Sequence, residues 1–77
     1  MSDFDTEIDT SGLNCPLPVL KARKTLNDMS PNQRLRLICT DSGALKDIPA
    51  FCKMTGNVLL SSEEVDGKLH FIIEKGA

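Results

Sequence analysis

The sequence predicts an α/β (α+β) two-layer sandwich of order β-α-β-α-β-β, in which a four-stranded mixed sheet carries two helices on one face. Apolar and polar residues alternate over residues 34–40 and 68–74, a pattern typical of half-buried strands. Apolar residues recur at helical spacing over 16–29 and 44–55, which indicates two amphipathic helices. A chain of 77 residues has room for one small core, so a single domain is expected.

The first half of the chain predicts a strand, a helix and a second strand. Residues 5–9 indicate a strand that alternates acids with three residues on its other side, Phe4, Thr6 and Ile8. The helix over 16–29 has one apolar stripe, formed by Val19, Ala22, Leu26 and Met29. In the strand over 34–40, three residues face inward, Leu35, Leu37 and Cys39. A crossover of this length implies that the two strands are parallel.

The second half predicts a helix and a hairpin. Pro49 removes a backbone donor from the helix over 44–55, so its regular part is expected to begin near Asp47, which would cap it. Gly56 is a suitable stop after the expected buried face of Ile48, Phe51, Cys52 and Thr55. The strands over 57–64 and 68–74 are joined around an Asp-Gly pair, which is typical of a hairpin. The sheet face away from the helices would carry Ile38, His70 and Ile72 and is expected to be partly apolar.

Composition and charge exclude several classes of protein. No apolar run approaches the ~20 residues that span a bilayer, so no membrane partner is expected. The acidic N-terminal segment lacks the basic and apolar regions of a signal peptide, which favours a cytoplasmic location. The net charge of −2 argues against direct nucleic-acid binding. Residues 1–4 are expected to form a flexible N-terminus, and residues 5–77 the single domain.

Three cysteines, at positions 15, 39 and 52, are consistent with a reducing compartment. Their odd number and wide spacing predict neither a disulfide framework nor a zinc site, and no metal or cofactor is expected on this chain. Cys39 falls on an inward strand position and Cys52 on an apolar helix stripe, so both are expected to be buried. A secondary redox role for Cys52 stays open.

The segment Cys15-Pro16-Leu17-Pro18 is the candidate site. With Cys15 as N-cap, Pro16 becomes the first helical residue, where proline is favoured. Pro18 removes a further donor, so the Leu17 amide is expected to reach the sulfur and, with the helix dipole, to favour the thiolate. In a CxxC oxidoreductase the position of Pro18 holds the resolving thiol. Its absence favours a site that holds a sulfur species over one that exchanges disulfides.

Residues that follow the motif suggest a docking surface. Leu17 and Leu20 fall outside the buried stripe and are expected to be exposed beside the thiol. Lys21, Arg23 and Lys24 add positive potential, either as a solvated face or as a patch for an acidic partner protein. Arg23 flanks the buried stripe, and we expect it to contact a partner or to support the thiolate.

The chain resembles the TusA/SirA-like sulfur carrier proteins. The resemblance rests on Asp9-x-x-Gly12-Leu13-x-Cys15-Pro16-x-Pro18, on Arg23-Lys24, and on the stretch Asp47-Ile48-Pro49-Ala50-Phe51-Cys52 in the second helix. It covers essentially the whole chain after about residue 5, and the family has the fold order given above. Ser42 and Asn57 depart from a common family pattern, in which proline and histidine stand at these positions.

The resemblance implies that Cys15 accepts sulfane sulfur as a persulfide from a cysteine desulfurase and relays it to a cysteine of an acceptor protein. Such a protein is a relay carrier of sulfurtransferase type that needs partners rather than a stand-alone enzyme. Pyridoxal phosphate would belong to the desulfurase. In the best-known branch the sulfur ends in 2-thiouridine at the tRNA wobble position; other branches serve sulfur oxidation or molybdoenzymes. The departures at Ser42 and Asn57 leave the branch open.

Two other functions remain possible at this point. Cys15 could cycle with Cys39 or Cys52 as a thiol redox protein, which predicts a stable intramolecular disulfide under mild oxidation. Small domains of this strand order also bind RNA, although the acidic net charge and the lack of Trp and Tyr weigh against that function.

Overall fold

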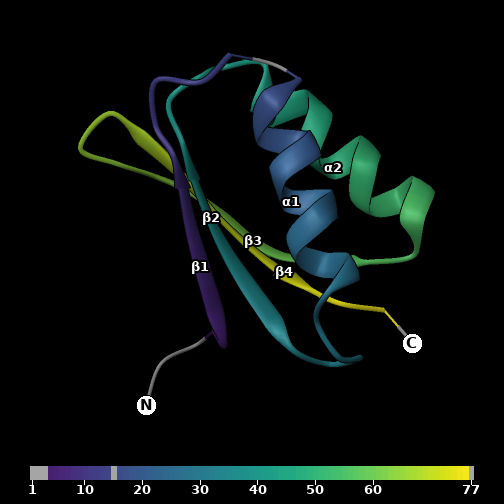
Figure 1. Ribbon diagram of the computed structural model, residues 1–77. Coiled ribbons are helices and arrows are strands. Elements are labelled where there is room, and N and C mark those ends of the chain that lie inside the picture. Colours follow the sequence, from purple (N-terminus) through teal and green to yellow (C-terminus); the bar gives the residue numbers. More distant parts are fainter. Residues whose placement is uncertain (1–3, 15, 77) are drawn as a thin grey trace.

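The computed structural model describes residues 4–14 and 16–76. Their elements follow the predicted order: β1 (Thr6–Thr10), α1 (Leu17–Asn27), β2 (Arg34–Cys39), α2 (Ala44–Thr55), β3 (Val58–Val65) and β4 (Lys68–Glu74). The four strands form one sheet in the spatial order β1-β2-β4-β3. β1 and β2 are parallel, as expected from the helical crossover, and the other two pairs are antiparallel. Both helices cover the same face of this mixed sheet, which confirms the predicted fold class (Figure 1).

The core lies between the sheet and the two helices. The inward residues of β2 and β4 alternate with exposed or half-buried ones, which confirms the pattern predicted from sequence. Fully buried side chains from both layers meet here, including Leu35, Leu37, Phe71, Leu26 and Ile48. Burial of each such side chain contributes about 1.5–3 kcal/mol to the free energy of folding. This packing holds α1, and therefore its first turn, in a defined position on the sheet.

The first helix differs from its prediction at both ends. It begins at Leu17 with Pro16 as N-cap, one residue later than expected, and Pro18 is buried while Val19 is only partly buried. At the other end, the amides of Asp28 and Met29 bond to carbonyls three residues back, at 3.1 Å each. This tighter last turn ends the α-helix at Asn27 and still buries Met29, as predicted.

The second helix is continuous from Ala44, so the expected late start near Asp47 is wrong. Asp41 organises the turn before it, because its carboxylate accepts the Gly43 amide at 3.2 Å and its carbonyl accepts the Ala44 amide at 3.1 Å. Pro49 therefore lies inside an established helix and costs it one bond, to the carbonyl of the exposed Leu45.

The end of the second helix and its buried face were largely predicted. Ile48, Phe51 and Cys52 are buried, whereas Thr55 is exposed and bonds its hydroxyl to the Phe51 carbonyl at 2.7 Å. The expectation that Thr55 belongs to the buried face was therefore wrong, because the side chain can satisfy its hydroxyl at the helix surface. Gly56 ends the helix with a left-handed φ of 75°, as predicted.

The hairpin forms as predicted from the Asp-Gly pair. Asp66 and Gly67 both have positive φ, 52° and 80°, which is the backbone of a two-residue type I′ turn. β3 is shifted by one residue from its expected bounds and contains a register irregularity between Leu59 and Ser61.

The sheet face away from the helices differs from prediction at Phe4. This ring was expected beside Thr6 and Ile8, but Arg36 packs over it on the open face, 5.4 Å from the ring centroid. Phe4 precedes β1, so the alternation of the strand does not extend to it. His70, which was expected on this face, accepts a hydrogen bond at Nδ1 from the Arg36 guanidinium at 2.7 Å.

Candidate functional site

The loop that leads into α1 is anchored at the carboxyl ends of the two parallel strands. The hydroxyl of the buried Thr10, at the end of β1, donates to the Ile38 carbonyl at 2.7 Å. The Gly12 amide donates to the Thr40 hydroxyl at 2.9 Å, and the positive φ of Gly12, 84°, suits a residue without a side chain. These bonds hold the segment that precedes position 15 at one end of the sheet.

The helix start is built from the residues that flank position 15. The Leu17 amide donates to the Asn14 carbonyl at 2.9 Å, and the Leu20 amide donates to the Pro16 carbonyl at 3.0 Å. The turn at Asn14 thus uses the amide that was expected to reach the sulfur. Pro18 is fully buried and locks the first turn of α1 to the core. Cys15 itself lies outside the described residues.

The outer face of α1 carries the predicted exposed leucines. Leu17 and Leu20 are 45% and 51% exposed, which confirms their place outside the buried stripe. Lys21 and Lys24 are also exposed. These four residues follow the i, i+3, i+4, i+7 spacing of one helix face, which we call the leucine–lysine face.

Arg23 points to a different place, a groove of about 500 Å³ between the two helices. This interhelical groove begins at Pro16 and is lined on the α1 side by Val19 and Arg23. Its α2 side comprises Asp47, Ala50, Phe51, Met54 and Thr55. The lining is mostly apolar apart from the charged residues Arg23 and Asp47, and Pro16 at its end directly follows position 15 in the chain. The predicted basic residues thus separate into two surfaces.

Met54 lines this groove and was not among the residues predicted for the site. Its side chain is 86% exposed, an unusual position for so apolar a residue. A signal was present, because Met54 falls outside the helix stripe of Ile48, Phe51 and Cys52. Methionine side chains adapt to varied partners, which suits a transient docking surface.

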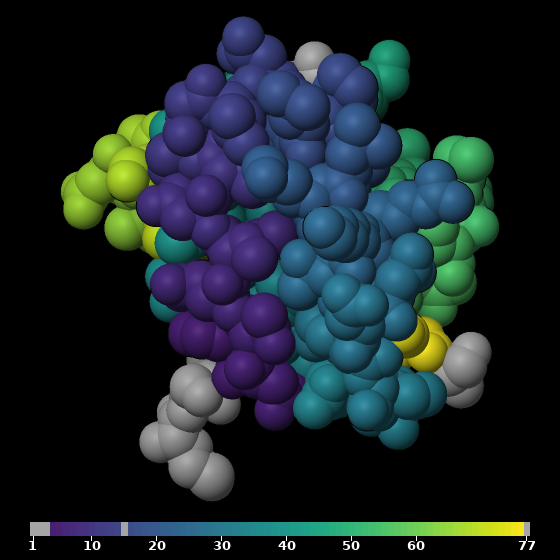
Figure 2. Space-filling model, viewed as in Figure 1, coloured from purple at the N-terminus to yellow at the C-terminus, as the bar shows by residue number. Residues whose placement is uncertain are grey.

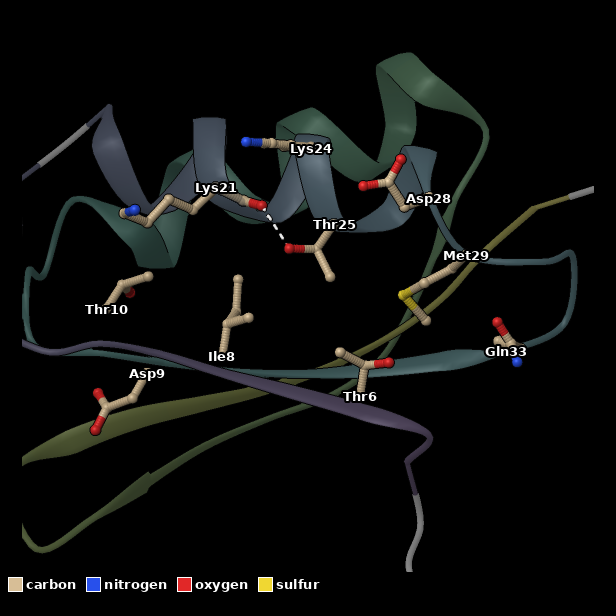
Figure 3. A pocket seen from close by; sticks show the side chains of 10 residues that line it. All are labelled: Thr6, Ile8, Asp9, Thr10, Lys21, Lys24, Thr25, Asp28, Met29 and Gln33. Atoms are coloured by element: carbon tan, nitrogen blue, oxygen red, sulfur yellow. Dashed lines mark hydrogen bonds between the residues drawn. The ribbon is translucent and has the colours of Figure 1, made fainter.

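A second groove, of about 620 Å³, separates α1 from β1. Figure 3 shows Lys21, Lys24, Thr25 and Asp28 on the helix side and Thr6, Ile8 and Thr10 on the strand side. The Thr25 hydroxyl is occupied by a bond to the Lys21 carbonyl at 2.9 Å. Residue spacing does not predict this groove, because its width depends on the distance between α1 and the edge of the sheet.

The other two cysteines are in an environment that lowers their thiol reactivity. Cys39 and Cys52 are both buried. Burial raises the pKa of the Cys39 thiol to about 11, with a further contribution from the negative charge of Asp41, and burial alone raises that of Cys52 to about 11. The expectation that both are core residues is confirmed.

Within the described residues, no cluster of three or more histidine, cysteine, aspartate or glutamate side chains is arranged to hold a metal ion. No helix in this part of the chain is both long enough and apolar enough to cross a membrane.

Comparison with solved structures identifies the class of fold. The crystal structure of a SirA-like protein from Desulfitobacterium hafniense superposes with a TM-score of 0.84, covering 95% of this chain and 100% of that one. The two sequences are 21% identical, so this likeness concerns the fold. The molecule thus has the α+β fold of this SirA-like protein, and its first helix begins near the carboxyl ends of the two parallel strands.

Sequence comparisons then identify the family. The family model described as sulfurtransferase TusA matches residues 6–75. The sulfur carrier protein TusA of Allochromatium vinosum is 60% identical over 75 residues, covering 97% of this chain and 99% of that protein. A putative sulfur carrier protein of Neisseria meningitidis serogroup A is 43% identical over 67 residues, covering 87% and 90% respectively. The chain belongs to the TusA family of sulfur carrier proteins.

Proposed function

We propose that Cys15 accepts sulfane sulfur as a persulfide from a cysteine desulfurase and passes it to a cysteine of an acceptor protein. In the first step the Cys15 thiolate attacks the terminal sulfur of the donor's persulfide. The donor's S–S bond breaks, a new S–S bond forms on Cys15, and the donor cysteine leaves as a thiolate. The exchange has no net oxidation, so it requires no cofactor on this chain; pyridoxal phosphate belongs to the donor.

The observation that carries this proposal is the arrangement of docking surfaces around position 15. Transfer between two cysteines requires that both sulfurs meet, so the two proteins must pack closely around the site. The leucine–lysine face and the interhelical groove both start at the first turn of α1. We assign Leu17, Leu20, Lys21 and Lys24 to one contact surface, and Pro16 and Arg23 to the other.

Pro18 supports the site from the core. It occupies the position at which an oxidoreductase would carry a resolving thiol, and its burial gives the first turn a rigid base. A persulfide on Cys15 therefore has no partner thiol within the motif. The raised pKa and the burial of Cys39 and Cys52 make a thiol redox cycle the weaker candidate.

For the destination of the sulfur we propose 2-thiolation of the tRNA wobble uridine, through an acceptor protein in the cytoplasm. Direct RNA binding is not part of this role, since the chain has a net charge of −2. Loss of 2-thiouridine in cells that lack the protein, restored by the wild type and not by Cys15→Ser, is the expected result. Unchanged 2-thiouridine would assign the chain to sulfur oxidation or molybdoenzyme supply instead.

The carrier step is tested with purified protein, a cysteine desulfurase and cysteine. Intact-mass measurement should show the addition of one sulfur atom, which reducing agent removes. The addition should be absent in Cys15→Ser and present in Cys39→Ala and Cys52→Ala, the matched controls that each remove a buried thiol. Retained addition in Cys15→Ser would exclude Cys15 as the carrier.

A further inference from the structure

One edge of the sheet is formed by β1, which pairs only with β2 among the described strands; the opposite edge is β3. The Arg34 carbonyl accepts a bond from the amide of Asp5, just before β1, and the Ile38 carbonyl accepts one from the Thr10 hydroxyl, so alternate residues of β2 face β1. In a parallel ladder, a β2 residue that faces β1 does not bond to its own register partner. It bonds to the two β1 residues on either side of that partner. Arg36 is in register with Glu7, and Ile38 with Asp9.

It follows that Glu7 and Asp9 direct their own backbone N–H and C=O groups away from β2, toward the free edge. Figure 2 shows β1 on the molecular surface beside α1, with no other segment in front of it in this view. An uncovered edge of this kind is a template for a further strand.

The groove between α1 and β1 provides room on the helix side of such a strand. A strand added at the usual spacing of about 4.8 Å from β1 would project alternate side chains toward α1. There they would meet Ile8 and Met29 on the apolar side and three charged residues of α1, Lys21, Lys24 and Asp28. The two lysines outnumber the aspartate, so basic side chains are disfavoured on that side. Uncharged side chains suit this position.

On the opposite face, the free edge is acidic. Glu7 and Asp9 alternate with the inward residues of β1 and lie toward the sheet face away from the helices; Figure 3 shows Asp9 on the side opposite Ile8. Bonds from the Ser11 hydroxyl and then from the Ser11 amide, the latter at 2.9 Å, lower the pKa of Asp9, so this carboxylate is ionised at neutral pH.

This charge decides between a second copy of the chain and a different partner. Antiparallel pairing of β1 with the β1 of another copy would set Glu7 and Asp9 against the same acids, and like charges on facing strands are destabilising. Basic side chains on an added strand would instead face these acids. The chain neutralises these acids in part, since Arg36 pairs with Glu7 at 3.5 Å and the positive charge of Lys68 acts on Asp9.

We propose that the free edge of β1 binds, by strand addition, an extended segment of a partner protein that carries basic side chains at alternate positions and uncharged ones between them. Backbone bonds to Glu7 and Asp9 supply the pairing, and the acidic face selects the sequence. This surface acts independently of the chemistry at Cys15.

The test uses amide hydrogen exchange, measured by NMR, with two synthetic strand peptides. One alternates lysine with threonine and valine; the control peptide has glutamate in place of each lysine. The lysine peptide should slow exchange at Glu7 and Asp9 by about tenfold or more when bound. The glutamate peptide should not. The paired substitutions E7K and D9K should reverse this preference.

Two results would overturn the proposal. One is unchanged exchange at both amides with millimolar lysine peptide, or equal slowing by the two peptides. The other is slowing that depends on protein concentration without any peptide, which would assign the edge to a second copy of the chain.

Discussion

In the variant Cys15→Ser the only remaining thiols are the two buried ones, Cys39 and Cys52, so alkylation of this variant measures their reactivity alone. A thiol with a pKa of about 11 in place of 9.0 has about one hundredth of the thiolate at neutral pH, and thiolate is the species that reacts with an alkylating agent. Burial adds a second barrier, because the reagent reaches Cys39 or Cys52 only when the core opens. In native Cys15→Ser, alkylation should therefore be at least about a hundredfold slower than in denatured protein.

The assay follows intact mass against time with excess iodoacetamide, in native buffer and in denaturant. Denatured protein is the control, in which both thiols should react at the rate of an ordinary cysteine. If either thiol in the folded variant reacts within about tenfold of its denatured rate, the conclusion that burial makes these thiols unreactive is wrong. A redox cycle between Cys15 and that thiol would then again be a candidate function of the protein.

The other predictions concern docking, pH and packing. Arg23→Glu should slow sulfur transfer from the desulfurase by about tenfold, whereas Lys53→Glu, an equal change of charge on an exposed residue outside the grooves, should not; equal slowing would indicate a general charge effect. Folding raises the thiol pKa values, so their contribution to the free energy of unfolding is complete below pH 9 and declines from about pH 9 to 11; chemical denaturation should show a smaller decline in Cys39→Ala/Cys52→Ala. Phe71→Ala should cost about 3–5 kcal/mol of unfolding free energy, and a cost below about 1 kcal/mol would contradict its central place in the core.

Local patterns were sufficient to predict most of the fold. Alternation placed Leu35, Leu37 and Cys39 inward, and the Asp-Gly pair predicted the hairpin turn, because both signals depend on neighbouring residues alone. Pro49 misled the prediction of α2, since the turn organised by Asp41 starts the helix before the proline is reached. The hydrogen bonds of this one turn decide where α2 begins.

The site was predictable in its residues and less so in its geometry. Leu17 and Leu20 are exposed as the helical wheel required. The Leu17 amide, however, belongs to a turn with Asn14, a bond that sequence spacing does not reveal. The two grooves on either side of α1 also depend on the separation between elements. Met54 shows this, because its significance comes from the packing of α2 against α1.

The position of the transferred sulfur within the chain tests the central claim most directly. Trypsin places the three cysteines on separate peptides, which end at Lys21, Lys46 and Lys53. After incubation with desulfurase and cysteine, alkylation of the native protein followed by peptide mass mapping should find the extra sulfur on the peptide that ends at Lys21. Extra sulfur on either of the other two peptides, with none on that one, would contradict the assignment of Cys15 as the sulfur carrier.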